Sequence, residues 1–277
     1  MGFRFVGIAG LPRSGSTLLC QLLAMHPQIH CDGHSSPLCN AVLGARRQIS
    51  DDAFFLAQLD THYDSAYASL RGALHGFMRG WYVGSGDAGL VVDKNRAWLS
   101  ALDLLLDLEP EARLIVPLRE LGQVYGSIEA QHQRSVLIDF SDHLADLDRF
   151  GRAERLFGRD KTLGAQLAAV EAVQDLPTAM RERIFFLRFE ELVRAPHERM
   201  AALFDWLGVA PQALDFEHLP VRPHESDSHY RHKFVHRQQP RLEAPREHAI
   251  PPRIQASIER GWAWYYRQFY PWVEAAA

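Results

Sequence analysis

A cluster of hydroxyl and basic side chains separates two apolar runs near the start of the chain. Residues 10–17 read GLPRSGST. They follow an apolar run at residues 3–9 and precede leucines at helical spacing from residue 18, which predicts a strand, a loop and a helix. Such a loop directs backbone N–H groups and the positive end of the helix dipole at one point. The segment therefore predicts a phosphate-binding loop.

The spacing of the two glycines nearly matches the P-loop pattern G-x4-G-K-[ST], but Ser16 stands at the lysine position. That lysine holds the β- and γ-phosphates in P-loop NTPases. We therefore expect a phosphate cradle without NTPase chemistry, in which Arg13 supplies positive charge and three hydroxyls donate: Ser14, Ser16 and Thr17. An ordinary strand–helix turn with flexible Gly and Ser residues is the alternative.

Other chemically capable side chains stand where predicted strands end. Lys94 follows the apolar run at residues 90–92, and Arg119 ends the run at residues 112–118. His34 lies in a turn-rich segment, residues 32–37, that follows a short extended stretch. Because ligands bind at the carboxyl ends of strands in doubly wound sheets, we expect these side chains near the cradle. For Lys94, a simple role in capping the strand in solvent is the alternative.

Imidazole is suited to take a proton from an alcohol or phenol near neutral pH. His34 is therefore our candidate for a general base, with His30 and Asp32 as the other candidates. The chain contains 14 histidines, so a loop histidine without a special role is the competing interpretation.

The string GLPRSGSTLL resembles the loop that binds the 5′-phosphosulfate in sulfotransferases that use 3′-phosphoadenosine 5′-phosphosulfate (PAPS), a fold related to the P-loop kinases. The longer run GLPRSGSTLLCQLLAMHPQIHC is most similar to the tyrosylprotein-sulfotransferase-like branch and its bacterial relatives. The resemblance implies that the 5′-phosphosulfate contacts one loop: Pro12, Arg13, Ser14, Gly15, Ser16 and Thr17.

The same resemblance gives roles to residues at the strand ends. His34 falls where that branch has a glutamate as base, whereas other members of the superfamily use a histidine. Lys94 resembles the strand-end lysine that contacts the sulfonate and the bridging oxygen. The family holds the 3′-phosphate with a strand-end Arg and a Ser eight residues later, a spacing that Arg119 and Ser127 reproduce.

Two further regions bear on the 3′-phosphate. The basic residue that often follows that Ser by four positions is Gln131 here, so the grip is weaker or is completed by Arg134. In the family, a late basic loop folds over the nucleotide and contacts this phosphate. By resemblance we assign Arg231 and Lys233 to that lid, with Tyr230 beside the adenine or the acceptor. A solvated basic turn is the alternative.

Composition limits the class of protein. The 277 residues are 47% hydrophobic, enough for one α/β domain spanning residues 1–277. A formal net charge of -4 argues against a general nucleic-acid or membrane-surface binder. Three cysteines, an odd number, predict free thiols in a reducing compartment. Since no run approaches the roughly 20 apolar residues of a membrane span, and cleavage of the short apolar N-terminus would remove the cradle, we expect a soluble cytoplasmic protein.

Strands alternating with helices predict a P-loop-like α/β fold with three layers, in which helices cover both faces of a parallel sheet of about five strands.

Residues 51–83 carry helical periodicity, and we expect most of their aromatic side chains in the core and some at an acceptor pocket. Residues 135–158 indicate a solvated, variable insert. The string RFEELVRAPHERMAALFDWLGV is interpreted as structural, and residues 255–272 predict a closing helix that packs on the sheet.

Together these predictions indicate an enzyme that transfers a sulfuryl group in line from PAPS to an acceptor hydroxyl or amine. The reaction requires no metal, and 3′-phosphoadenosine 5′-phosphate (PAP) is its product. A P-loop kinase of a small molecule and a non-catalytic nucleotide-binding protein are the alternatives. No motif identifies the acceptor. A small molecule, a glycan and a protein tyrosine are all compatible with the sequence. The oligomeric state stays open, a homodimer included.

Overall fold

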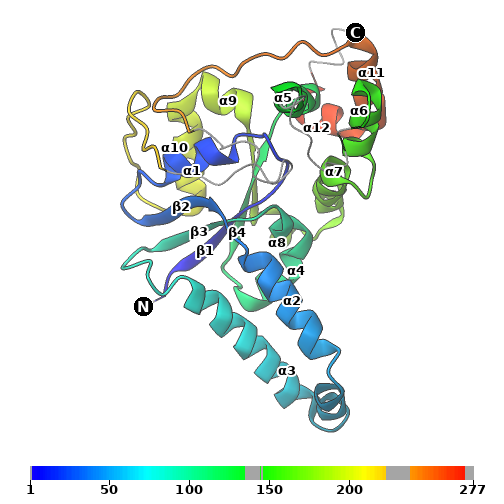
Figure 1. Ribbon diagram of the computed structural model, residues 1–277. Coiled ribbons are helices and arrows are strands. Elements are labelled where there is room, and N and C mark those ends of the chain that lie inside the picture. The colour runs from blue at the N-terminus through cyan, green and yellow to red at the C-terminus, as the bar shows by residue number, and fades with distance from the viewer. Residues whose placement is uncertain (1, 135–143, 145, 223–237, 272–277) are drawn as a thin grey trace.

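A five-stranded parallel sheet lies at the centre of the computed structural model, which describes residues 2–134, 144, 146–222 and 238–271 (Figure 1). The sheet has the order β2-β3-β1-β4-β5, and every paired neighbour is parallel. This confirms the predicted fold class. The strands are β1 (Arg4–Ile8), β2 (Ile29–Ser35), β3 (Leu90–Lys94), β4 (Arg113–Leu118) and β5 (Ile184–Arg188).

Helices connect and cover these strands. Among them, α2 and the short helix α8 were not predicted, and the closing helix of the sequence prediction is two helices, α11 and α12. The helices are α1 (Ser16–Leu23), α2 (Leu38–Ser50), α3 (Ala53–Trp81), η1 (Arg96–Ala101, 3-10), α4 (Leu102–Leu108), α5 (Leu121–Arg134), α6 (Arg149–Phe157), α7 (Thr162–Ala172), η2 (Val173–Asp175, 3-10), α8 (Thr178–Arg181), α9 (Phe189–Arg194), α10 (Pro196–Leu207), α11 (Pro252–Gly261) and α12 (Ala263–Phe269).

The side chains of β1 alternate between two hydrophobic cores, one on each face of the sheet. Phe5 belongs to one core, which also contains buried residues of α2, α4, α5, α7 and α12. Val6 and Ile8 belong to the other core, together with residues of α1 and α10. Successive side chains of a strand point to opposite faces, so the molecule has the three predicted layers. In Figure 1, α1 and α10 lie on one side of the sheet and α2 and α4 on the other.

The register brings the strand ends to one edge. Lys94 at the end of β3 pairs with Ile8 at the end of β1 and with Ser35 at the end of β2. At the other side of β1, the end of β4 at Leu118 pairs with Arg188 of β5. Residues that directly follow these strands therefore converge, as the topology of a parallel sheet requires.

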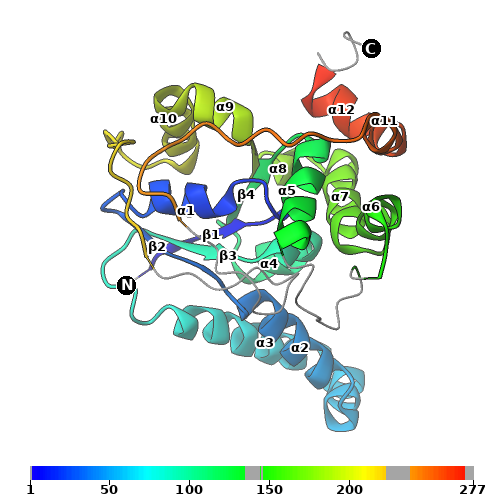
Figure 2. The same cartoon turned by 45° about the horizontal axis from the view of Figure 1, so that its top comes forward.

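The aromatic residues of α3 contradict their prediction. Five of them are exposed, by 43% to 82% of their surface: Phe54, Tyr63, Tyr67, Phe77 and Trp81. From α3, Leu74 and Met78 belong to the core and Leu70 packs against it, and Ala66 is also buried. The reason is that α3 and α2 form a hairpin that extends away from the sheet (Figures 1 and 2), which leaves the outer face of α3 in solvent.

The prediction of a solvated insert at residues 135–158 is also wrong for part of its length. Leu156 of α6 is 1% exposed and joins the core beside α7. The hydrophilic composition misled the interpretation because an amphipathic helix buries only one face. The acidic residues at 139 and 142 lie outside the described residues.

No helix in the described part of the chain is long and apolar enough to cross a bilayer. The cytoplasmic location and the single domain of residues 1–277 stay predictions.

A buried ion pair fastens α6 to α5. Both Nε and Nη2 of Arg152 donate to the carboxylate of Glu129, each at 2.7 Å, and both residues are less than 10% exposed. Burial alone would raise the pKa of Glu129, but hydrogen bonds and attraction from Arg152 outweigh it and lower this pKa below its ordinary value.

We expect Glu129→Gln to destabilise the protein at pH 7 by about 3 kcal/mol, because the substitution leaves the buried Arg152 without its counter-ion. Since the folded-state pKa of Glu129 is lowered, its contribution is present above the ordinary glutamate pKa and is lost as pH falls through the folded value. The gap between variant and wild type should therefore close toward acid pH. Urea denaturation at several pH values measures it.

The matched control is Glu198→Gln, which breaks an exposed pair with Arg199. We expect less than about 1 kcal/mol for it. Equal effects of the two substitutions, or a gap for Glu129→Gln that widens in acid, would show that the buried pair does not hold α6 in place.

Candidate active site

The loop between β1 and α1 adopts a conformation that its glycines make accessible. Gly10 and Gly15 have φ angles of 100° and 91°, which side chains of L-residues disfavour. A Cβ atom on Gly15 would also stand 2.4 Å from the ring of Phe189. Gly15 is therefore needed both for the turn and for the contact between this loop and the start of α9.

The N-terminus of α1 faces the cavity described below. Gly15 is the N-cap residue and has no side chain with which to cap the first N–H groups of the helix. Ser16 and Thr17 follow it and line the cavity. Backbone N–H groups and the helix dipole therefore offer an anion a site at this point.

Ser14 behaves differently from the other predicted hydroxyl donors. Its side chain is 1% exposed, and its Oγ donates to the carbonyl oxygen of Leu11 at 2.6 Å. This bond closes the loop on itself. Neither Ser14 nor Pro12 is among the described residues that line the cavity, so both shape the loop from within.

Arg119 ties the loop to the end of β4. Its Nη1 donates to the carbonyl oxygen of Arg13 at 3.0 Å, and its guanidinium carbon lies 5.1 Å from the centre of the Phe189 ring. The side chain is 8% exposed. Burial is the main influence on the pKa of Arg119 and lowers it, partly offset by attraction to Glu190. An arginine remains charged under these conditions, so a buried cation faces the cavity.

The C-terminal helix α12 braces the segment that carries Arg119. The hydroxyl of Tyr265 donates to the carbonyl oxygen of Arg119 at 3.0 Å. Tyr266 donates to Glu120 at 2.5 Å and Tyr270 donates to Glu190 at 2.9 Å. Glu190 in turn accepts the backbone N–H of Glu120 at 3.0 Å. The strand end thus gains its position from α9 and α12, more than 60 residues away in sequence.

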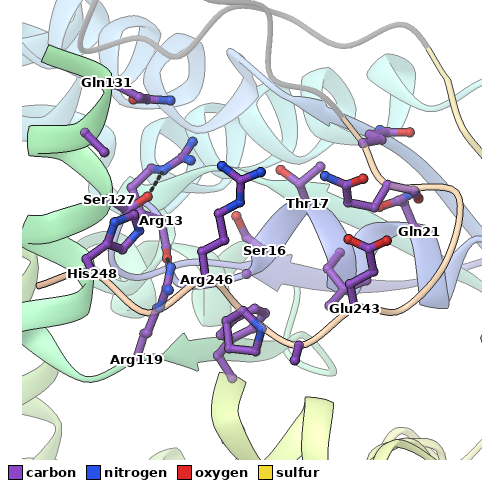
Figure 3. A pocket seen from close by; sticks show the side chains of 18 of the residues that line it. Arg13, Ser16, Thr17, Gln21, Arg119, Ser127, Gln131, Glu243, Arg246 and His248 are labelled. Atoms are coloured by element: carbon purple, nitrogen blue, oxygen red, sulfur yellow. Dashed lines mark hydrogen bonds between the residues drawn. The ribbon is translucent and has the colours of Figure 1, made fainter. Parts of the chain in front are cut away.

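Ser127 is the seventh residue of the following helix, α5, and joins the same group. Its Oγ accepts a hydrogen bond from Nε of Arg13 at 2.9 Å (Figure 3). The structure therefore brings together Arg13, Arg119 and Ser127 from three elements that are far apart in sequence.

Residues 238–250, which we call the strap, cross over this group without forming a helix or strand (Figures 1 and 2). At one end, Gln21 of α1 donates to the carbonyl oxygen of Gln239 at 3.0 Å. At the other end, Gln123 of α5 exchanges two hydrogen bonds with the backbone of His248, at 2.8 and 3.1 Å. The strap is thus fixed to α1 at one end and to α5 at the other.

Loop, strand end, α5 and strap enclose a cavity of about 860 Å³. Its volume suits a nucleotide-sized ligand. Gln21, Arg246 and His248 contribute side chains beside the predicted ones (Figure 3). Six of the predicted site residues line it: Arg13, Gly15, Ser16, Thr17, Arg119 and Ser127.

Lys94 and His34 lie together at the neighbouring strand ends. Lys94 is 8% exposed, and its Nζ donates to the carbonyl oxygen of Gly33 at 2.7 Å, the residue before His34. His34 is exposed and belongs to β2, rather than to a turn after the strand as predicted. Neither residue is among the described ones that line the cavity.

A buried carboxylate supports this second group. Asp93 is fully buried and accepts hydrogen bonds from the hydroxyl of Tyr82 at 2.6 Å and from Nε1 of Trp98 at 2.5 Å. Burial raises the pKa of Asp93, and hydrogen bonds from Ser36, Tyr82 and Trp98 oppose that rise. Asp93 thus fixes the end of β3 directly beside Lys94.

Some predicted residues stay unplaced, and some site residues were not predicted. Arg231, Lys233 and Tyr230 lie outside the described residues, as does the side chain of Arg134. The strap and Phe189 were missed as parts of the site. The polar residues of the strap were visible in the sequence, but a segment without periodicity gives no sign of what it contacts.

Comparisons with known proteins concern the chain as a whole rather than its individual site residues. The family model described as "Sulfotransferase family" matches residues 6–212. Mouse carbohydrate sulfotransferase 4 is 42% identical over 45 residues, which are 16% of this chain and 12% of that protein. The matched segment is therefore a small part of the curated relative.

Two solved structures are similar in fold. A sulfotransferase from Alicyclobacillus acidocaldarius is 15% identical, with a TM-score of 0.53 and coverage of 95% of this chain and 92% of that one. The sulfotransferase domain from the curacin biosynthetic pathway is 14% identical, with a TM-score of 0.50 and coverage of 95% and 98%. At these identities the likeness concerns the fold alone.

We expect Tyr265→Phe to lower the free energy of unfolding by about 1–3 kcal/mol, because it removes the buried hydrogen bond to the carbonyl oxygen of Arg119. Urea denaturation measures the loss. Tyr63→Phe on the exposed face of α3 is the control and should be within about 0.5 kcal/mol of wild type. A Tyr265→Phe variant as stable as this control would mean that α12 does not brace the strand end.

Proposed function

The chain belongs to the sulfotransferase family, and from this we propose that it transfers a sulfuryl group from PAPS to an acceptor hydroxyl or amine, releasing PAP. One observation carries the choice of donor. Two anion-binding groups share one cavity: the N–H groups at the start of α1, and Arg119 with Ser127. PAPS bears phosphate groups on both the 5′ and the 3′ position of one nucleoside, which matches two such groups.

In this proposal the cradle holds the 5′-phosphosulfate. N–H groups at Ser16 and Thr17 neutralise part of its charge without moving, because the loop is already closed by the Ser14 bond. Arg119 and Ser127 hold the 3′-phosphate. Binding both ends of the nucleotide fixes the sulfur atom relative to the acceptor, so positioning supplies much of the rate.

The chemical step requires a proton acceptor and a stabilised leaving group. His34 takes the proton from the acceptor as the acceptor oxygen or nitrogen forms its bond to sulfur. The bond between sulfur and the bridging oxygen breaks, and its electron pair stays on the 5′-phosphate. Lys94, one residue along from Asp93 at the end of β3, stabilises the negative charge that develops there. No metal takes part in this scheme.

The acceptor is proposed only as a hydroxyl or amine. The name of the mouse relative states a carbohydrate acceptor. The match to it covers only 16% of this chain, which is too short to include an acceptor site. A kinase reaction is not favoured, since Ser16 stands where P-loop kinases carry the lysine that holds the β- and γ-phosphates.

We expect the wild-type protein to bind PAP without magnesium and more tightly than ADP or ATP. Arg119→Ala should weaken PAP binding about 10- to 100-fold, because a charge-assisted bond to phosphate contributes roughly 1.5–3 kcal/mol. Isothermal titration calorimetry measures both. Arg181→Ala, on the exposed helix α8, is the control and should bind like wild type. Tighter binding of ATP than of PAP would contradict the assignment of the donor.

The role of His34 separates turnover from binding. We expect His34→Gln to lower kcat by about 10²- to 10⁴-fold, the usual contribution of a general base, while the affinity for PAP is unchanged. Transfer of radiolabelled sulfate from PAPS to a panel of hydroxyl and amine acceptors provides the assay.

His30→Gln and Asp32→Asn are the matched comparisons, because these side chains lie on the same strand and contact each other at 3.2 Å. Both variants should retain most of the activity. A loss in either of them with none in His34→Gln would move the role of base to that residue.

A further inference from the structure

The strand β2 leaves its regular pairing with β3 at the candidate base. The pairing stops at Cys31 and resumes at Ser35, which stands opposite Lys94. Between these points β2 has three residues, whereas β3 has one. Such a bulge is rare between parallel strands, and bulges beside active sites redirect side chains. His34 is one of the three bulged residues, so the bulge determines where it stands.

A glycine gives the bulge its backbone conformation. Gly33, the middle residue of the three, has a φ angle of 80°, which residues other than glycine disfavour. A Cβ atom at this position would lie 3.8 Å from Cβ of Cys20 and 3.8 Å from Nε2 of Gln238, which are ordinary van der Waals contacts. The conformation of the backbone, rather than a lack of room, therefore requires glycine here.

The bulge also directs a carbonyl group at Lys94. The Nζ atom of Lys94 donates to the carbonyl oxygen of Gly33 at 2.7 Å, and Lys94 is 8% exposed. A lysine ammonium group sits on a flexible stem of four carbons, so a fixed backbone acceptor restricts its position. Because the direction of this carbonyl follows from the conformation of Gly33, the position of the ammonium group depends on the bulge.

Both flanks of the bulge are held in place. On the far side, the N–H group of Ser36 donates to the carbonyl oxygen of Lys94 at 2.9 Å, and the side chain of Asn95 donates to the carbonyl oxygen of Ser36 at 2.6 Å. On the near side, Cys31 is buried in the core. A change in the conformation of Gly33 therefore moves its immediate neighbours and is not absorbed by the flanking strand.

We propose that Gly33 is a positioning residue for the transfer: its left-handed conformation directs its carbonyl oxygen to Lys94 and places His34 outside the regular strand pairing. The inference rests on the proposed function, which assigns the leaving 5′-phosphate to Lys94 and the acceptor proton to His34. Gly33 touches neither donor nor acceptor in this scheme. One peptide unit thereby sets the separation between the group on the leaving side of the sulfur atom and the group on the acceptor side.

The test compares two glycines that share a backbone conformation. Gly86 has a φ angle of 66° in an exposed turn, and a Cβ atom there would meet nothing within 4 Å. Gly33→Ala and Gly86→Ala therefore both force a positive φ on alanine without a steric clash. Urea denaturation measures the stability of each variant. Isothermal titration calorimetry without an acceptor measures the dissociation constants of PAPS and PAP, which differ in the sulfuryl group.

We expect Gly33→Ala to weaken binding of PAPS relative to PAP by about 3- to 10-fold, a part of the loss expected for Lys94→Met, which removes a charge-assisted bond. In the transfer assay with the acceptor panel, its kcat should fall by about 10- to 100-fold, since a small misplacement of a reacting group costs that much. Gly86→Ala should match wild type in both measurements. Gly33→Asn should recover most of the loss, because Asn adopts a positive φ more readily than Ala.

Three results would overturn the inference. The first is a Gly33→Ala variant with the wild-type ratio of PAPS to PAP affinity. The second is an equal effect of Gly33→Ala and Gly86→Ala on that ratio, which would reduce the role of Gly33 to general backbone strain. The third is a full additional loss of PAPS affinity when Gly33→Ala is combined with Lys94→Met, because a residue that acts through Lys94 adds little once its charge is gone.

The failure of the proposed function would look different. A wild-type protein that binds ADP as tightly as PAP would contradict the use of PAPS itself, whatever Gly33 does. A wild-type protein that prefers PAP, together with a Gly33→Ala variant that behaves like Gly86→Ala, would keep the proposed function and reject the inference alone.

Discussion

The hydrogen bond from Arg119 to the carbonyl oxygen of Arg13 joins the two strand ends on which the candidate site is built. It links the loop after β1 to the residue after β4, and the two strands are direct neighbours in the sheet. Because Arg119 is buried, the bond is shielded from competing water and holds the loop in one position. The left-handed conformation of Arg13 and the direction of its side chain both depend on that position.

Keeping a cation buried at this point has a cost, and the surrounding structure offsets it. The ring of Phe189 covers the Arg119 guanidinium, and Glu190 attracts it from the same helix start. Glu190 is itself satisfied by Tyr270 and by the N–H group of Glu120. A buried charge is tolerated when its neighbours are hydrogen-bonded in this way. The segment interpreted from sequence as structural therefore holds the cavity-lining side chain of Arg119 in place.

The site divides into two parts with different surroundings. Arg13, Arg119 and Ser127 line the cavity beneath the strap, and Arg119 and Ser127 are each less than 10% exposed. Lys94 and His34 lie at the ends of β3 and β2, outside the residues that line this cavity. In the proposed reaction, Arg119 and Ser127 hold the 3′-phosphate of the donor, whereas His34 meets the acceptor and Lys94 stabilises the leaving 5′-phosphate.

The sequence by itself determined the parallel sheet, its strands and the glycine-containing loop between β1 and α1, because buried parallel strands are continuous apolar runs and the loop has a fixed glycine spacing. It also placed Arg119, Ser127 and Lys94 at strand ends or on the next helix. Only the tertiary structure decided that Arg13 turns to Ser127, that the strap covers the cavity and that the aromatic side chains of α3 face solvent. Periodicity describes the faces of one element. The first two features depend on contacts between elements more than 100 residues apart, and the third depends on whether another element covers the outer face of α3.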